Sequence, residues 1–227
     1  MRIAELFYSI QGEGMLLGLP SVFIRTSGCN LRCHWCDTPY TSWEPEGEEM
    51  DLPGILEFVQ RHSTGYTVIT GGEPMIAPGI IPLTEALRES GQHITIETAG
   101  TVFAPVRCDL MSISPKLANS TPHERDGGRW AQRHDRTRIQ PDVLSRLVSA
   151  YDYQLKFVVV SEADLPEIEE VIRLCGAARY RVVLMPEGID GSTLRERGKW
   201  LAETCKQRGW RFSPRLHVEL WGDRRGV

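Results

Sequence analysis

Short runs of apolar and β-branched residues alternate along the chain with longer segments of helical periodicity. The short runs predict strands over residues 20–27, 66–70, 93–97, 109–113, 155–160 and 180–185. The segments between and after them predict helices over residues 51–63, 79–91, 140–150, 164–176 and 192–209. Such alternation is typical of a parallel sheet with crossover helices. We therefore predict an α/β fold, an incomplete barrel of six strand–helix units that is open on one side.

Length and composition favour one soluble domain over residues 1–227. The chain is shorter than the roughly 250 residues of a complete eight-unit barrel. Its net charge of −4 disfavours a general nucleic-acid binder. No window approaches the ~20 apolar residues of a membrane span, and the first residues lack the apolar segment of a signal peptide. We expect a cytoplasmic protein with no nucleic-acid or membrane partner.

The least regular stretch covers residues 119–138 and carries five arginines, two histidines and a pair of glycines. It is predicted to be an irregular polar loop. A solvated surface loop, a lid over the mouth of the barrel and a partner-binding surface all fit this composition.

Three of the six cysteines, Cys29, Cys33 and Cys36, fall within eight residues with the spacing C-x3-C-x2-C. They directly follow the first predicted barrel strand, at the end where such barrels build their active sites. Three thiolates on one loop can bind a [4Fe–4S] cluster and leave one iron free for another ligand. The alternative is a zinc site completed by His34, His62 or His217. The remaining cysteines, Cys108, Cys175 and Cys205, are predicted to be small core residues.

The cysteine spacing, with Trp35 before the last cysteine, resembles the signature of the radical S-adenosylmethionine (SAM) superfamily. The second predicted strand ends in Gly71-Gly72-Glu73-Pro74, which is similar to the GGEP motif of that superfamily. This resemblance implies a [4Fe–4S] cluster whose free iron is chelated by SAM. It also implies that the Gly71–Gly72 backbone aligns the methionine moiety and that Glu73 engages its ammonium group.

Further motifs narrow the resemblance to the 7-carboxy-7-deazaguanine synthase family, radical SAM lyases of queuosine biosynthesis. They are Gln11-Gly12-Glu13-Gly14, Phe23-Ile24-Arg25, Asp37-Thr38, Glu97-Thr98-Ala99-Gly100-Thr101, Ser114-Pro115-Lys116, Gln154-Leu155-Lys156-Phe157 and Leu216-His217-Val218. The resemblance implies that 6-carboxy-5,6,7,8-tetrahydropterin loses a hydrogen atom at C6, contracts its ring and releases ammonia. It further implies Mg²⁺, a homodimer and a flavodoxin- or ferredoxin-type electron donor.

The resemblance also assigns roles to individual residues. Cys29, Cys33 and Cys36 would ligate the iron–sulfur cluster, Glu97 would act in catalysis, and Thr38 would bind Mg²⁺. Substrate contacts are implied for Ile10, Gln11, Gly12, Arg25, Thr70, Glu97, His217 and the carboxylate of Val227. SAM contacts are implied for Trp35, Cys36, Asp37, Gly72, Glu73, Ser114, Pro115, Lys116, Gln154, Leu155, Lys156 and Phe157.

Some of these residues also suit their roles by their own chemistry. The planar guanidinium of Arg25 matches a carboxylate, and Gln11 offers a donor and an acceptor to the edge of a pterin. Plainer interpretations remain: Arg25 as a surface cation, Thr38 as a helix cap, Glu97 in a structural ion pair and His217 in the core. Ala99 and Glu187 depart from the family pattern, so residues 185–188 are left outside the predicted site.

Two other functions share part of this pattern. A radical SAM enzyme that activates a protein partner would carry the same cysteine triplet. A zinc-binding interaction module would carry it without iron.

Overall fold

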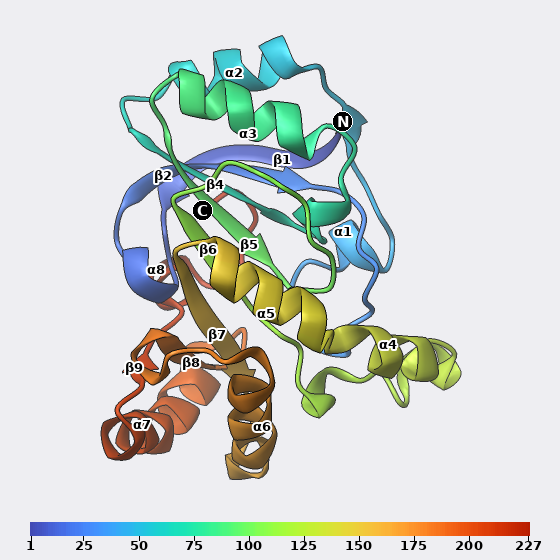
Figure 1. Cartoon of the computed structure of the whole chain (residues 1–227), viewed down its shortest axis with the longest axis vertical. Helices are drawn as coiled ribbons and strands as arrows, with labels where there is room; N and C mark the ends of the chain where they lie inside the picture. Colours follow the sequence, from blue (N-terminus) through green and yellow to red (C-terminus); the bar gives the residue numbers. More distant parts are fainter.

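The computed structural model covers residues 1–227 and has six central parallel strands in one nine-stranded sheet (Figure 1). These strands are β2 (Pro20–Thr26), β4 (Tyr66–Gly71), β5 (His93–Thr98), β6 (Leu110–Ile113), β7 (Tyr153–Val159) and β8 (Val182–Pro186). Each pairs in parallel with the next. They match the six predicted strands to within two residues at each end. The predicted α/β fold class is confirmed.

Three further strands, which flank the six central ones, were not among the predicted strands. β1 (Arg2–Ile10) pairs antiparallel with β2, and β3 (Glu48–Glu49) pairs antiparallel with β1. At the other edge, β9 (Arg211–Phe212) pairs with β8. The resulting order is β3-β1-β2-β4-β5-β6-β7-β8-β9. The two-residue strands β3 and β9 are too short to show any periodicity. β1 has only two buried residues, Ile3 and Phe7, so it lacks the strict alternation of a half-buried strand.

Five helices lie where the periodicity predicts them. They are α2 (Leu52–Gln60), α3 (Ile80–Glu89), α5 (Pro141–Ala150), α6 (Leu165–Cys175) and α7 (Gly191–Arg208). Three shorter helices were not predicted: α1 (Pro39–Ser42), α4 (Ala131–Arg138) and α8 (Leu216–Trp221). The four residues of α1 and the six of α8 are too few for a helical stripe of apolar residues, and α4 is too polar to have one.

The prediction of an irregular loop over residues 119–138 needs correction. The segment contains 3-10 turns at Ala118–Ser120 and Arg125–Gly128, followed by helix α4. His134 is the only buried residue of α4. A helix with almost no buried face leaves no hydrophobic periodicity in the sequence, which is why it was missed.

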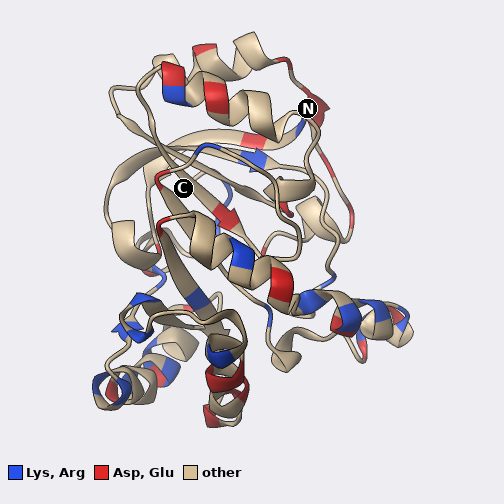
Figure 2. Ribbon diagram, viewed as in Figure 1, with Lys and Arg blue, Asp and Glu red and all other residues tan.

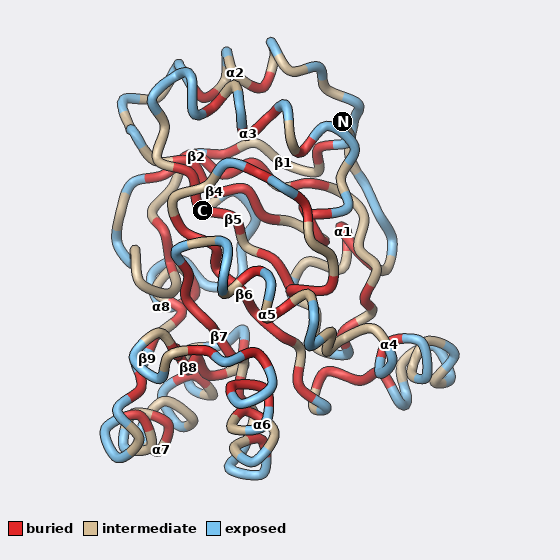
Figure 3. The backbone as a smooth tube through the Cα atoms, viewed as in Figure 1, coloured by how far each residue is buried: buried red, intermediate tan, exposed pale blue.

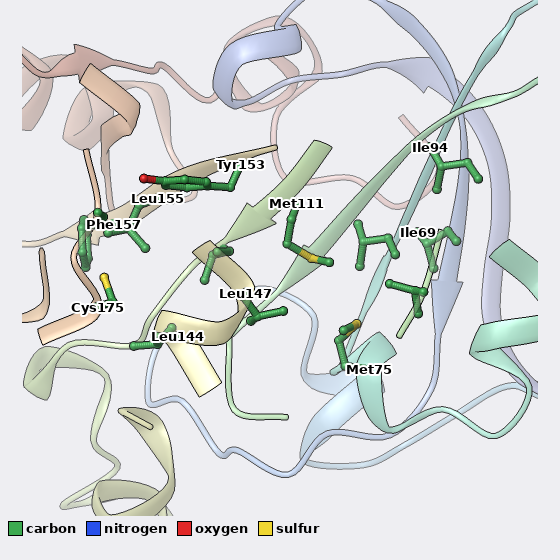
Figure 4. Close-up of a cluster of buried hydrophobic side chains, with 14 of the residues drawn as sticks. Ile69, Met75, Ile94, Met111, Leu144, Leu147, Tyr153, Leu155, Phe157 and Cys175 are labelled. Carbon is green, nitrogen blue, oxygen red and sulfur yellow. The ribbon is translucent and has the colours of Figure 1, made fainter. Parts of the chain in front are cut away.

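The hydrophobic core contains 33 buried residues, packed between the sheet and the flanking helices (Figures 3 and 4). On β7, Leu155 and Phe157 are fully buried in this core, near Leu144 of α5 and Cys175 of α6. Successive side chains of a strand point to opposite faces, so Gln154 and Lys156 lie on the other side. The side chains of Leu155 and Phe157 therefore pack in the core and do not line the cavity, so their predicted SAM contacts have no support from side-chain placement. Cys175 and Cys205 belong to the core, as predicted.

None of the helices is both long and apolar enough to span a lipid bilayer. The carboxyl ends of the parallel strands meet along one edge of the sheet, where the loops after β2, β4, β5, β6 and β7 gather.

The placement of Phe157 can be tested through stability. Phe157→Ala should lower the free energy of unfolding by about 3–5 kcal/mol, because it empties a fully buried site. Phe212→Ala, on an edge strand where the ring is 39% exposed, should cost about 1 kcal/mol or less. Urea denaturation followed by circular dichroism measures both. Equal losses would contradict the placement of Phe157 in the core.

Candidate functional site

A cavity of about 810 Å³ opens at the carboxyl ends of the parallel strands. Its wall includes all the residues predicted to contact substrate, namely Ile10, Gln11, Gly12, Arg25, Thr70, Glu97, His217 and Val227. It also includes Cys29, Cys33, Cys36, Thr38 and, of the predicted SAM contacts, Trp35, Asp37, Gly72, Ser114, Lys116 and Lys156. The fold thus brings residues from most of the predicted motifs to one hollow.

The three cysteines lie on the loop of residues 27–38, which we call the cysteine loop. Its backbone is held from outside the cavity. The His34 amide donates to the Ser120 carbonyl at 2.7 Å, and the Arg32 amide donates to His134 Nδ1 at 3.1 Å. The Trp43 indole donates to the Cys33 carbonyl at 3.0 Å. These bonds orient the loop before any ligand binds.

The cysteine side chains fit an iron–sulfur cluster better than the zinc alternative. Burial raises the pKa of Cys29 to about 12 and raises that of Cys33 further, so both are neutral thiols unless a metal supplies positive charge. Of the candidate fourth ligands, His34 and His62 do not line the cavity, and His217, which does, packs against Gly12. No three His, Cys, Asp or Glu side chains converge closely enough for a single metal ion. A cavity wall with three separate thiols fits a [4Fe–4S] cluster bound by three cysteines.

The end of β4 packs directly against the cysteine loop. The Gly72 amide donates to the Thr26 carbonyl at 3.1 Å, and the Glu73 amide donates to the Gly28 carbonyl at 2.9 Å. A Cβ atom on Gly72 would lie 2.0 Å from the Gly28 oxygen. Glycine is therefore required here by the close approach of two backbones.

Glu73 does not line the cavity, contrary to its predicted contact with the SAM ammonium group. It is fully buried, and its carboxylate accepts hydrogen bonds from Thr98 Oγ1 at 2.7 Å, the Ala99 amide at 2.8 Å and the Met75 amide at 3.0 Å. The Glu73 carboxylate thus accepts hydrogen bonds from the end of β5 and the loop after it. A sequence motif alone does not reveal this role.

Gln154 and Pro115 also lie outside the cavity wall. The Gln154 amide donates to Ser112 Oγ at 2.7 Å and accepts from the Met15 amide at 2.7 Å. Gln154 therefore fastens the N-terminal segment to the sheet. Lys116, in contrast, reaches the cavity and donates to both the carbonyl and the hydroxyl of Ser114, at 2.8 and 2.9 Å.

A buried ion-pair network crosses the cavity floor. Glu13 binds Lys156 at 2.5 Å and Arg215 at 3.2 Å, and Arg215 also binds Asp37. Burial by itself would raise the pKa of Glu13, but Lys156 and Arg215 hold it well below its ordinary range. No role was predicted for Glu13, although it lies within a quoted motif, and Arg215 was missed. The position of Arg215 next to the motif Leu216-His217-Val218 is the only local sign in the sequence that it belongs to the site.

Glu97 is the centre of a second polar group. Thr70 Oγ1 donates to it at 2.8 Å, Gln11 Nε2 donates at 3.2 Å, and Lys156 Nζ lies 4.0 Å away. His217 packs against Gly12 so closely that a Cβ there would lie 2.0 Å from its Nδ1. Burial lowers the pKa of His217, so its ring is neutral at neutral pH.

Arg25 keeps hydrogen-bonding capacity free. Its Nε donates to Glu5 at 2.7 Å, and the Tyr40 hydroxyl donates to the same carboxylate oxygen at 2.8 Å. The two terminal nitrogens of Arg25 have no protein acceptor. Glu5 and Tyr40, which the sequence did not identify, thus orient a guanidinium that can bind an anion in the cavity.

Thr38 stands at the N-terminus of α1, but its side chain caps no backbone amide. Its hydroxyl lies 3.4 Å from Thr41 Oγ1 and 3.9 Å from Cys36 Sγ. The interpretation of Thr38 as a helix cap is therefore not supported. Met185 and Glu187, which were left outside the predicted site, line the cavity.

The last residues of the chain form another part of the wall. Gly222, Asp223, Arg224, Arg225 and Val227 line the cavity. The Arg225 guanidinium lies 3.5 Å from the Tyr40 ring centroid and pairs with Glu46. Val227 therefore lines the same cavity as the other residues predicted to contact the substrate.

Comparison with known proteins gives consistent matches. The Radical SAM superfamily model matches residues 23–129. The chain is 48% identical to the 7-carboxy-7-deazaguanine synthase of Rhodopirellula baltica, over 100% of this chain and 89% of that protein. It is 47% identical to the Halobacterium salinarum protein of the same name, over 98% and 91%.

A solved structure with a similar fold is QueE from Escherichia coli, with a TM-score of 0.69 and 28% identity over 95% of this chain and 94% of that one. The fold also resembles that of SuiB from Streptococcus suis, with a TM-score of 0.57 and 15% identity over 85% of this chain and 48% of that one. At that identity the likeness concerns the fold alone.

The close approach at Gly72 yields a test. Gly72→Ala should destabilise the protein by about 1–3 kcal/mol, because the new methyl group forces two backbones apart. It should also lower the iron bound after reconstitution, since the cysteine loop would move. Gly65→Ala is the matched control, because a Cβ there meets nothing within 4 Å. Thermal unfolding and iron analysis measure both effects, and similar results for the two variants would refute the packing argument.

Proposed function

The chain belongs to the 7-carboxy-7-deazaguanine synthase family of the radical SAM superfamily, and on that premise we propose that it converts 6-carboxy-5,6,7,8-tetrahydropterin to 7-carboxy-7-deazaguanine in queuosine biosynthesis. One observation of the structure carries this proposal: a three-cysteine loop and an anion-binding guanidinium line the same cavity. A zinc module has no need of an anion-binding group beside its thiols, and the guanidinium suits a small carboxylate substrate. The relatives that are 48% and 47% identical are both 7-carboxy-7-deazaguanine synthases, which also favours the pterin enzyme.

The enzyme uses a [4Fe–4S] cluster and SAM. We propose that Cys29, Cys33 and Cys36 hold the iron–sulfur cluster. When bound, the two groups supply the radical that takes a hydrogen atom from C6 of the substrate. The task of the protein is to bind, orient and shield the substrate beside them.

The substrate carries a carboxylate and a flat ring edged with donors and acceptors. The free terminal nitrogens of Arg25 suit the carboxylate, since a guanidinium binds it through two parallel hydrogen bonds. Glu97, oriented by Thr70 and Gln11, suits the N–H groups of the pyrimidine edge. His217, Gly12, Ile10 and Val227 complete the same wall.

SAM would occupy the part of the cavity nearest the cysteine loop. Gly72 offers a bare backbone there, and Trp35, Asp37, Ser114 and Lys116 line the adjoining surface. Lys156 is engaged by Glu13, so we assign it to holding the cavity floor as well as to the predicted SAM contact.

We extend the proposal to Mg²⁺, bound through the Thr38 hydroxyl. Mg²⁺ retains several waters and needs few protein ligands, and the hydroxyl lines the cavity without capping a helix. A cytoplasmic location, a homodimer and a flavodoxin- or ferredoxin-type electron donor rest on the family resemblance. The six free cysteines suit a reducing compartment.

The direct test is anaerobic incubation with carboxytetrahydropterin, SAM, a reductant and Mg²⁺. Chromatography should detect 7-carboxy-7-deazaguanine. Cys33→Ala should abolish both the product and the visible absorbance of the iron–sulfur cluster. Cys108→Ala, outside the cavity, should retain both. A parent protein that binds iron but forms no deazapurine would refute the proposed reaction.

The role of Thr38 predicts a change in metal dependence. Thr38→Ala should reduce the stimulation of turnover by Mg²⁺, while SAM binding measured by equilibrium dialysis should stay near the parent value. Thr38→Ser keeps the hydroxyl and should restore the stimulation. If Mg²⁺ stimulates Thr38→Ala as strongly as the parent, the hydroxyl is not a ligand.

Glu5 is expected to act as a positioning residue for Arg25. Glu5→Gln removes the charge that holds the guanidinium and should raise the KM for carboxytetrahydropterin about tenfold, equivalent to ~1.4 kcal/mol. The effect on kcat should be smaller, because Glu5 acts on binding. Tyr40→Phe keeps the Glu5–Arg25 pair and should raise KM less. A fall in kcat at constant KM would contradict this assignment.

A further inference from the structure

Five arginines that take part in no ion pair of the protein gather on one surface. They are Arg32, Arg125, Arg129, Arg133 and Arg136. We call this surface the arginine face. Arg32 belongs to the cysteine loop, and the others belong to the 3-10 turn at Arg125–Gly128 and to the segment that continues into α4. Figure 2 shows the basic residues along α4, which projects from the body of the molecule.

The arginine face is positively charged, whereas the whole protein carries a net negative charge. Within residues 119–138, four arginines of the face and Arg138 stand against three acidic residues, in a chain of net charge −4. Two of those acids are engaged: Asp126 accepts from the Trp130 indole at 3.2 Å, and Asp135 binds Arg138 at 2.9 Å. The face is therefore a basic patch on an acidic protein.

Aromatic stacking orders four of the arginines. Two of the four also donate to the cysteine loop: Arg32 to the Cys29 and Leu31 carbonyls, and Arg125 to the His34 carbonyl. The guanidinium carbons of Arg32, Arg129 and Arg133 lie 4.9, 5.4 and 5.7 Å from the Trp130 ring centroid. Arg125 lies 4.1 Å from the centroid of the Trp43 ring. Arg129 and Arg133 are stacked but donate to no acceptor of the protein, so their N–H groups stay available for carboxylates of another molecule.

The arginine face is joined directly to the cysteine loop. Arg125 donates to the His34 carbonyl at 3.0 Å, and the Arg32 amide donates to His134 Nδ1 at 3.1 Å. His134 is buried, and burial lowers its pKa to about 4, so it stays a neutral acceptor. Its other nitrogen lies 2.9 Å from Ser120 Oγ. A molecule bound on this face would lie beside the loop that carries the thiols.

The position of residues 119–138 does not support a lid over the cavity. No residue of 119–138 lines the cavity, and no other helix covers α4 in Figure 1. Of the uses that fit the composition of this segment, a partner-binding surface is the one that its position supports.

We propose that the arginine face is the docking surface for the small acidic protein that reduces the iron–sulfur cluster. This inference rests on the proposed function. In the step it serves, one electron leaves the reduced donor, which is oxidised, and enters the iron–sulfur cluster, which is reduced; no atom is transferred. Opposite charges on the two proteins would steer their encounter and fix their orientation.

The test uses the reconstituted holoenzyme and a purified bacterial flavodoxin as probe. The double variant Arg129→Glu/Arg133→Glu should raise the Kd for flavodoxin by about tenfold or more at low salt, with a weaker salt dependence than the parent. Arg195→Glu/Arg211→Glu changes the net charge equally on exposed residues of α7 and β9 and should leave the Kd unchanged. Arg129→Gln/Arg133→Gln should give a smaller loss.

Turnover assays with two different reductants separate a defect in docking from a defect in catalysis. With dithionite, the Arg129→Glu/Arg133→Glu variant should match the parent in iron content and product formation. With flavodoxin and its reductase, it should form product more slowly. Equal Kd values for the two charge-reversed pairs would overturn the docking site. So would a variant that weakens binding of an RNA oligonucleotide but not of flavodoxin. A parent that forms no product even with dithionite would instead overturn the proposed function.

Discussion

The site depends on one geometric constraint: parallel strands end at the same edge of their sheet. Residues within or just after β2, β4, β5, β6, β7 and β8 are distant in sequence, yet they meet in one cavity. The helices bury the opposite face of each strand, so alternate residues serve either the core or the cavity. On β7 this alternation places Phe157 among core side chains and Lys156 in the cavity wall.

Buried charges then fix the cavity floor. Glu13, Lys156 and Arg215 have side chains that are at most 14% exposed, and each charge is balanced by at least one of the others. Charges of this kind are tolerated only when paired, and removal of one partner from such a pair typically costs about 3–5 kcal/mol. The network joins the N-terminal segment, the central sheet and the C-terminal segment. It therefore holds the substrate-facing residues in position before a ligand arrives.

The cysteine loop has a separate support on its outer side. Bonds from Ser120, His134 and Arg125 hold its backbone, while its thiols face inward. The same segment that braces the loop exposes unpaired arginines to solvent. One structural element thus connects the interior, where the chemistry takes place, with the surface, where an electron must enter.

The sequence by itself determined the six parallel strands, the five long helices and the positions of the cysteine, glycine and arginine motifs. Local periodicity and spacing carry that information, because each pattern repeats within a few residues. Only the tertiary structure decided that Glu73 and Gln154 serve neighbouring segments instead of the cavity, and that Glu5 orients Arg25. It also decided that Arg215 binds Glu13, 202 positions away. Pairings between distant residues depend on how whole elements pack, and no local pattern of residues encodes them.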